Sequence, residues 1–182
     1  MGLVVCVSSP RRLGHEMYLA KASTRRYTQP MSAPSEVLFY HLEHQPLEKV
    51  LPSLVEKTLA RGWRAVIQVG NDERLAALDQ LLWTYSDESF LPHGTVKSGS
   101  AADQPVYLTV GDETPNAAGV RFLVDGATTS TFTGIERLVY LFDGRDQDSV
   151  MSAREQWKAA KAAACAVTYW QQTEAGGWEK KA

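Results

Sequence analysis

The sequence lacks the features that mark secreted and membrane-spanning proteins. It holds only two cysteines, Cys6 and Cys165, which lie far apart, so neither a disulfide framework nor a cysteine zinc site is indicated. No segment approaches the roughly 18 consecutive apolar residues that cross a bilayer. The apolar patch at residues 3–7 is shorter than the ~7 to 15 residues of a secretory signal core. We therefore expect a cytoplasmic protein that makes no contact with a membrane.

Motifs for phosphate binding and nucleophilic catalysis are also missing. The sequence contains neither G-x4-G-K-[ST] nor G-x-S-x-G. The segment 69–73 has one glycine, Gly70, and two acids where a dinucleotide fingerprint needs three spaced glycines. His41, His44 and His93 have no accompanying cysteine and make an incomplete zinc shell. We therefore predict no catalytic residue, no metal site and no cofactor.

Positive charge is scarce over most of the chain. The formal net charge is −2, but residues 1–30 hold five cations against Glu16 alone, a local net charge of +4, which leaves −6 for residues 31–182. Broad phosphate binding relies on clustered Lys and Arg. Any contact with DNA is therefore expected to be local or indirect.

Residues 1–35 show no sustained helical or strand period, and we expect a disordered N-terminal extension. Met31, followed by Ser-Ala-Pro, is a candidate for the natural start of the protein. An organellar-type or nucleic-acid-binding arm is the functional alternative for this segment.

Apolar periodicity predicts a single α/β domain over residues 36–178. Short apolar runs predict strands at 37–42, 64–69, 105–110, 120–125 and 137–142, the last strand of the domain. Helical spacing predicts a helix from Leu47 to Arg61 and another from the cap at Asn71 to Trp83. Pro52 either kinks the first helix or lies in its first turn, with the regular part beginning near Leu51. Two consecutive strand–helix units predict a three-layer, Rossmann-like fold with a mostly parallel sheet and no phosphate-binding loop.

A final helix is predicted from about Asp148 to Trp170. At about 100° per residue, one side of it collects small or apolar residues and the other collects cations. The first side comprises Ala153, Ala160, Ala163, Ala164 and Val167. The second comprises Arg154, Lys158 and Lys161, bordered by Val150, Met151 and Trp157. This second side is either a solvated face with Trp157 packed against the sheet, or a basic stripe with an apolar edge that binds a partner.

Three large aromatic residues lie close together in the stretch 82–93. Trp83, Tyr85 and Phe90 follow a predicted helix, and no nucleophile or metal motif accompanies them. Aromatic side chains are enriched at the centres of protein interfaces. Trp83 and Phe90 therefore either contact a partner or fill the core of the domain.

Three carboxylates, Asp143, Asp146 and Asp148, follow the strand predicted at 137–142. The carboxyl end of a parallel strand is a place where Mg²⁺ can be held. The alternative is a turn followed by a helix N-terminus, where Gly and Asp are favoured for conformational reasons. The first interpretation would make the protein a Mg²⁺-dependent α/β phosphoesterase or nucleotide-binding enzyme.

The aromatic stretch fits the pattern W-x6-F-[LV]-P-H through Trp83, Phe90, Leu91, Pro92 and His93. With the basic, aromatic C-terminal segment that follows it, the sequence from about residue 36 to about residue 178 resembles the chi subunit of the bacterial DNA polymerase III holoenzyme. The resemblance implies a non-catalytic accessory subunit with a Rossmann-like fold. It implies that the protein binds the psi subunit, or an equivalent, within the clamp-loader assembly, and also the acidic C-terminal tail of single-stranded DNA-binding protein.

The resemblance also assigns residues to these contacts. Arg154, Trp157 and Lys158 match positions that hold the acidic tail, and the helical geometry adds Lys161 beside them. Val150 would line the pocket for the aromatic end of the tail, although some relatives have a cation there. The second protein surface would comprise Trp83, Phe90, Pro92 and His93.

Overall fold

The computed structural model describes residues 36–182. The predicted extension at residues 1–35, with the proposed start at Met31, lies outside the described residues. The described elements are β1 (Glu36–Leu42), α1 (Leu47–Ala60), β2 (Ala65–Gln68), α2 (Asp72–Thr84), β3 (His93–Gly94), β4 (Val106–Thr109), β5 (Val120–Leu123), β6 (Arg137–Asp143), α3 (Gln147–Ala162), β7 (Ala166–Gln172) and β8 (Trp178–Lys180), with short 3-10 turns at Val96–Ser98 and Ala101–Asp103.

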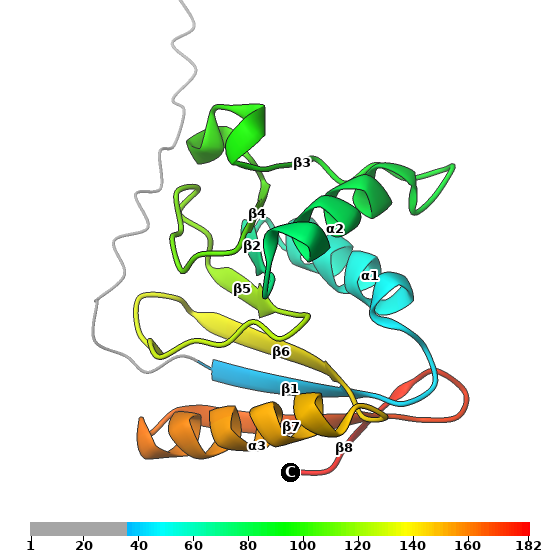
Figure 1. The fold of residues 1–182 in the computed structure, drawn as a ribbon, viewed down its shortest axis with the longest axis vertical. Coiled ribbons are helices and arrows are strands. Elements are labelled where there is room, and N and C mark those ends of the chain that lie inside the picture. Colours follow the sequence, from blue (N-terminus) through cyan, green and yellow to red (C-terminus); the bar gives the residue numbers. More distant parts are fainter. Residues whose placement is uncertain (1–35) are drawn as a thin grey trace, which may run out of the picture.

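One sheet of eight strands organises the domain (Figure 1). The strand order is β3-β4-β2-β5-β6-β1-β7-β8, and every neighbouring pair is parallel except β7 and β8. The prediction of a mostly parallel α/β sheet is confirmed. The antiparallel pair lies at one end of the sheet, where it adds two strands beyond the last one predicted.

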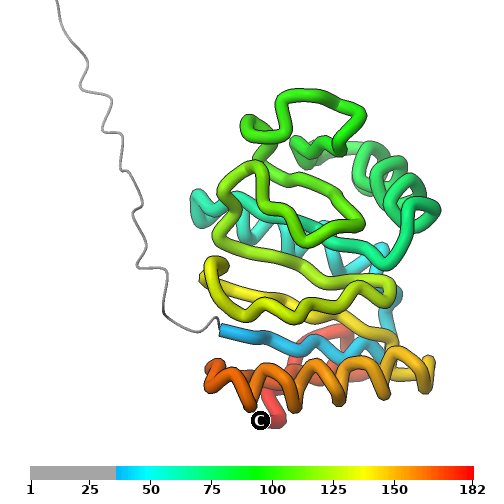
Figure 2. Tube along the Cα trace, turned by 60° about the vertical axis from the view of Figure 1, so that its left-hand side comes forward, coloured from blue at the N-terminus to red at the C-terminus, as the bar shows by residue number. Residues whose placement is uncertain are grey.

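The three helices cover the sheet in two separate layers. Successive residues of a strand point to opposite faces, and in β1 Leu38 packs with α1 and α2 whereas Val37 and Phe39 pack with α3. Figure 2 shows α3 in front of the sheet and α1 behind it. Because both faces are covered, the central strands are almost wholly apolar. The predicted three-layer arrangement is therefore present.

At the entry to α2, close backbone packing requires the glycine at position 70. Asn71 caps the helix, its side chain accepting a hydrogen bond from the Arg74 amide at 2.8 Å. A β-carbon at Gly70 would lie 2.4 Å from the backbone carbonyl oxygen of Asp125. Glycine is required here because the chain after β5 passes close by, as tightly packed backbones demand.

Helix α1 begins at Leu47 and continues through Pro52, which is buried inside it. Of the two interpretations of Pro52, the one that starts the helix near Leu51 is wrong. Proline removes one hydrogen bond from the helix, and the burial of Val50, Leu51 and Val55 against the sheet offsets that loss.

The prediction of one helix from Asp148 to Trp170 is wrong in its second half. Helix α3 ends at Ala162, and Ala164 adopts the left-handed conformation with φ of 57°. Cys165 is therefore buried beyond the helix instead of within it, and Val167 lies in β7. Strand β7 pairs in parallel with β1, whose backbone would otherwise be unpaired on that side. The alanine run keeps the helical period and contains no stop signal such as glycine.

Candidate partner-binding surfaces

Small residues fix helix α3 closely against the sheet. Ala153 and Ala160 are buried beneath it, and their small side chains let the helix axis approach β6 and β7. Asp146 caps the helix by accepting a hydrogen bond from the Asp148 amide at 3.1 Å. Residues separated by four, three and four positions lie in a row on one flank of a helix. The flank toward β7 therefore presents Val150, Arg154, Trp157 and Lys161.

Trp157 is half-buried and lies between the core and the cations of α3. Its ring centroid is 5.2 Å from that of Phe39 and 6.1 Å from that of Tyr169, with both contacts edge-to-face. The ammonium of Lys161 lies 5.4 Å from the indole centroid, within the range of a cation–π contact. The ring thus packs on the sheet, as the first interpretation predicts, and also faces a cation; binding of a partner by this face stays a prediction.

Arg154 and Tyr169 extend this flank toward β7. Burial raises the pKa of the Tyr169 hydroxyl, the charge of Glu43 adds to that, and the charge of Arg154 counteracts both. The same hydroxyl makes a 2.6 Å hydrogen bond with Nδ1 of His41. Sequence reasoning missed Tyr169 because the segment was assigned to a helix, although Val167-Thr168-Tyr169-Trp170 has the composition of a strand.

Lys158 differs from the other cations of α3. Its ammonium makes a 2.7 Å ion pair with Glu155, and both side chains are well exposed. Arg154 and Lys161 lie on the Trp157 side of the helix instead. The structure therefore brings Val150, Arg154, Trp157 and Lys161 together and leaves Lys158 at the margin.

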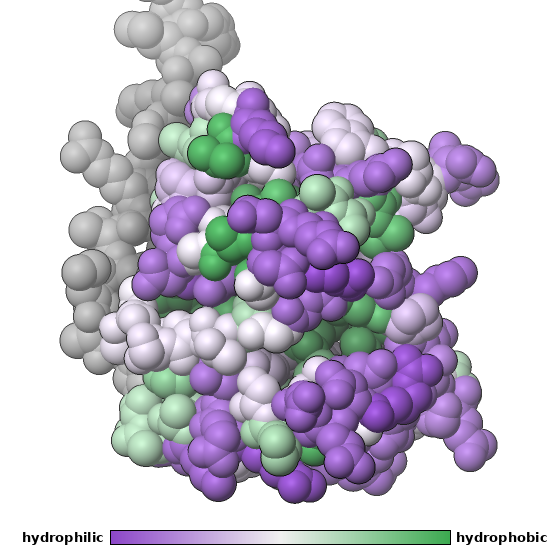
Figure 3. Space-filling view, in the orientation of Figure 1, coloured by the Kyte–Doolittle hydropathy of each residue, from purple (hydrophilic) through white to green (hydrophobic). Residues whose placement is uncertain are grey.

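Figure 3 shows the surface over α3 as mostly hydrophilic, with weakly hydrophobic side chains at its C-terminal end. Four exposed alanines lie at that end, at positions 159, 162, 163 and 164. The apolar and charged parts of α3 are therefore both open to a partner.

A second surface lies at the end of α2, where Trp83 and Phe90 are 56% and 59% exposed. Their ring centroids are 5.5 Å apart, and the Trp83 ring lies 4.9 Å from that of His93. His93 is buried and its Nδ1 is 2.7 Å from the carbonyl oxygen of Leu91. Pro92 is partly covered. Trp83 and Phe90 therefore do not fill the core, and His93 holds the ring of Trp83 from beneath.

The segment between these two aromatics is fixed to α1. The hydroxyls of Tyr85 and Ser89 both donate to the carboxylate of Glu56, at 2.7 and 2.6 Å. The bond from Ser89, followed by that from Tyr85, lowers the pKa of Glu56. These bonds hold residues 85–89 against α1. The chain turns within this segment, and the ring of Phe90 thereby contacts that of Trp83.

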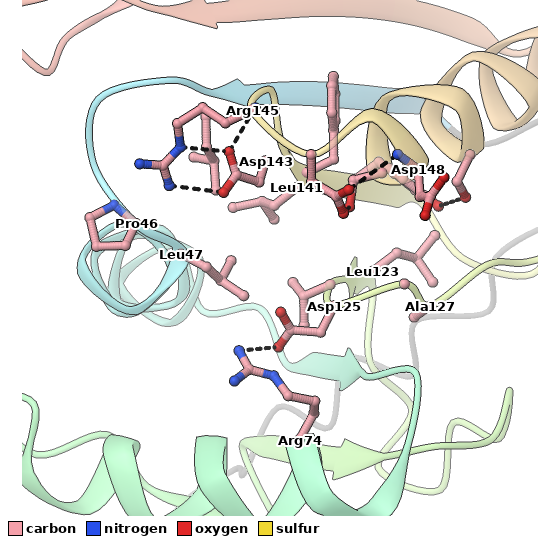
Figure 4. A pocket seen from close by; sticks show the side chains of 18 of the residues that line it. Pro46, Leu47, Arg74, Leu123, Asp125, Ala127, Leu141, Asp143, Arg145 and Asp148 are labelled. Carbon is pink, nitrogen blue, oxygen red and sulfur yellow. Dashed lines mark hydrogen bonds and ion pairs between the residues drawn. The ribbon is translucent and has the colours of Figure 1, made fainter.

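A hollow of about 680 Å³ lies at the carboxyl end of the sheet, between the starts of α1 and α3. Its floor is hydrophobic and its rim hydrophilic (Figure 3), and Figure 4 shows the charged side chains around it. Parallel sheets commonly bind ligands where successive helices leave to opposite faces. This is therefore where an enzymatic site would be expected.

The acids at this hollow are engaged in local structure. Arg145 donates to both carboxylate oxygens of Asp143, at 2.9 and 2.8 Å, and lowers its pKa. Asp146 caps α3 and accepts a 2.6 Å bond from the Ser149 hydroxyl. Within residues 36–182, no three His, Cys, Asp or Glu side chains are placed to hold a metal ion. The contacts of Asp143 and Asp146 are therefore those that the turn and helix-cap interpretation predicts, and Asp148 lies in the first turn of α3.

The opposite wall of the hollow contains an ion-paired cluster. Arg74 lies 3.0 Å from Asp125 and 3.2 Å from Glu48. Burial raises the pKa of Asp125, although the charge of Arg74 acts in the other direction. This cluster ties α1 and α2 to the loop after β5, and Figure 4 shows Arg74 directed at Asp125.

Within the described part of the chain, no helix is both long enough and apolar enough to span a bilayer.

Comparison with known proteins agrees with the resemblance drawn from the aromatic stretch. The family model described as "DNA polymerase III chi subunit, HolC" matches residues 35–168, which is more than half of the chain. The chain is 27% identical over 103 residues to a protein of Rickettsia prowazekii (strain Madrid E) described as "Probable DNA polymerase III subunit chi". That match covers 57% of this chain and 62% of the relative, less than two thirds of its length. The chain thus belongs to the family of the DNA polymerase III chi subunit.

Proposed function

We propose that this protein is an accessory subunit that catalyses no reaction and connects the clamp-loader assembly of DNA polymerase III to single-stranded DNA-binding protein. Membership of the chi family supports the assignment to the holoenzyme. Two separate exposed surfaces, one on α3 and one at the end of α2, support a bridging role because each is open to a different partner.

The α3 surface binds the acidic C-terminal tail of single-stranded DNA-binding protein. The observation that carries this assignment is the position of two cations, Arg154 and Lys161, beside the half-buried ring of Trp157, with Lys161 5.4 Å from its centroid. An acidic peptide with an aromatic end supplies carboxylates for the cations and a ring for the apolar edge formed by Trp157 and Val150. Because the cations are exposed, the affinity is micromolar and weakens with salt.

The surface formed by Trp83 and Phe90 binds the second protein, the psi subunit or its equivalent. Both rings are mostly exposed and in mutual contact, and rigid aromatic pairs of this kind often anchor interfaces. Pro92 completes the edge, and His93 positions Trp83 from below. This contact attaches the protein to the clamp loader.

Titration of a fluorescent peptide with the acidic tail sequence tests the α3 assignment. We expect Arg154→Ala and Lys161→Glu to raise the Kd about 3- to 10-fold, as befits loss of a charge-assisted contact at an exposed surface. Lys158→Glu has a smaller effect, because Lys158 already pairs with Glu155.

Lys57→Glu is the matched control, since it makes the same charge change on α1, on the other side of the sheet. Equal Kd values for wild type, Arg154→Ala and Lys161→Glu would contradict the assignment. Trp83→Ala leaves this titration unchanged but prevents co-purification with the clamp-loader subunits.

A further inference from the structure

The face of the sheet opposite α3 contains a groove that neither proposed surface uses. Helix α1 packs over β2 and β6 on this face, and β1, β7 and β8 lie beyond it (Figure 1). The groove runs along α1 and has a volume of about 230 Å³. Its floor is apolar, with Leu38, Phe122 and Val139 at the base. The groove is therefore an open, apolar channel and not a closed cavity.

Three aromatic rings from three strands form the outer part of this groove. Tyr40 of β1 stacks on Trp170 of β7, with centroids 6.4 Å apart and ring planes at 13°. Trp178 of β8 meets Tyr40 edge-on at 4.7 Å. All three rings are only half-buried. Part of each ring is therefore accessible to a ligand, although Tyr40 and Trp170 cover one face of each other.

Among residues 36–182, the charged side chains that line the groove are all cations: Lys57 and Arg61 from α1, and Arg137 from β6. Arg137 is held in place by Glu36, with Nε and Nη2 2.7 and 2.6 Å from its carboxylate. Lys180 of β8 pairs with Trp170, which puts its side chain on the same face. In the described part of the chain, three cations therefore line the groove and Lys180 lies on the same face, while Glu36 pairs with Arg137.

The cations reach the aromatic end of the groove. Burial raises the pKa of the Tyr40 hydroxyl, the charges of Arg137 and Arg61 lower it, and the charge of Glu36 raises it. Arg137 and Arg61 line the same groove as Tyr40. Positive charge and stacking surface occur within one short channel.

We infer that this groove binds a single-stranded nucleic acid. Bases stack on Trp170 and Trp178, and the phosphates lie against Lys57, Arg61 and Arg137. Open grooves that combine cations with aromatic platforms are the usual way in which proteins hold single strands, because each base has a stacking face and each nucleotide a charge. The bases of a duplex are already stacked on one another, so a duplex cannot use the aromatic walls. The inference does not depend on the α3 surface, which lies on the other side of the sheet.

Fluorescence anisotropy of a labelled oligothymidylate of about 15 nucleotides tests this inference on the full chain at low salt. We expect Arg61→Glu to weaken binding about 10-fold and Trp170→Ala to weaken it at least 5-fold, in line with the loss of one phosphate contact or one stacked base. Trp170→Phe keeps a stacking ring and restores most of the affinity. It also separates loss of stacking from loss of folding.

Lys161→Glu on α3 is the matched control, because it changes the charge equally and leaves the groove intact. The inference is overturned if Arg61→Glu and Lys161→Glu weaken the oligonucleotide equally, or if a hairpin duplex binds as tightly as the single strand. It is also overturned if the acidic peptide displaces the oligonucleotide in wild type but not in Lys161→Glu, since both ligands would then share the α3 surface. Failure here leaves the peptide titration on α3 unaffected, so the two proposals are tested separately.

Discussion

Two consecutive residues of α2, Leu82 and Trp83, should respond very differently to truncation. Leu82 is 0% exposed and packs in the core under α1, whereas Trp83 is 56% exposed and contacts Phe90 and His93. Leu82→Ala should lower the free energy of unfolding by about 2–5 kcal/mol, because it removes a fully buried side chain and leaves a cavity.

The cost of Trp83→Ala follows from how little of its ring is covered. A fully covered indole buries roughly 150–250 Å², and less than half of Trp83 is covered. At about 25 cal/mol per Å², the covered part of the ring gives an upper value of about 3 kcal/mol. Because the Phe90 ring that covers Trp83 is itself mostly exposed, we expect about 1 kcal/mol.

Urea unfolding followed by far-ultraviolet circular dichroism measures both variants. The slope of the transition should be unchanged in Trp83→Ala, since the same surface unfolds. Phe90→Ala should cost about as much as Trp83→Ala, and the double variant should cost less than the two single costs together, because each ring loses the other as its partner. If Trp83→Ala destabilises the protein as much as Leu82→Ala, the tryptophan belongs to the core and the second binding surface is refuted.

Two further predictions concern the carboxylates at the carboxyl end of the sheet. Because the pKa of Asp125 is raised in the folded state, its stabilising contribution is fully present below the ordinary aspartate pKa of about 3.9 and is lost as pH rises through the folded-state value. Asp125→Asn should therefore gain stability relative to wild type as pH rises from 4 to 7. A difference in the free energy of unfolding in urea that stays constant across that range would contradict this. Asp146→Ala should lower the free energy of unfolding by about 1 kcal/mol through loss of the α3 cap. Mg²⁺ should change the melting temperature of neither wild type nor variant. A rise in melting temperature with Mg²⁺ that disappears in the variant would instead support the metal-site interpretation.

The sequence alone determined most of the parallel sheet and the first two helices. The strands at 37–42, 64–69, 105–110, 120–125 and 137–142 were each predicted within one or two residues, because continuous apolar runs leave few alternatives to a buried strand. The cap at Asn71 was also predicted correctly, since capping is a local hydrogen bond between a side chain and the nearby backbone. The residues of the aromatic stretch likewise indicate the family from sequence alone.

The tertiary structure decided where the C-terminal helix ends. The alanines at 162–164 are compatible both with a continuing helix and with the end of a helix. The local sequence does not distinguish the two. The backbone of β1 offers unpaired hydrogen-bonding groups on its outer side, and residues 166–172 satisfy them as β7. That long-range pairing depends on residues about 130 positions away, which no local pattern can report.

The pairing of β7 with β1 also decided which side chains lie at the α3 surface and in the groove along α1. Tyr169 reaches Trp157 on one face of β7, and Trp170 reaches Tyr40 on the other, because successive residues of a strand point to opposite sides. The helical wheel grouped Arg154, Lys158 and Lys161 beside Trp157; all four lie within α3, where Lys158 pairs with Glu155. It could not place β7 or β8 beside them, because only the folded sheet brings those strands next to β1.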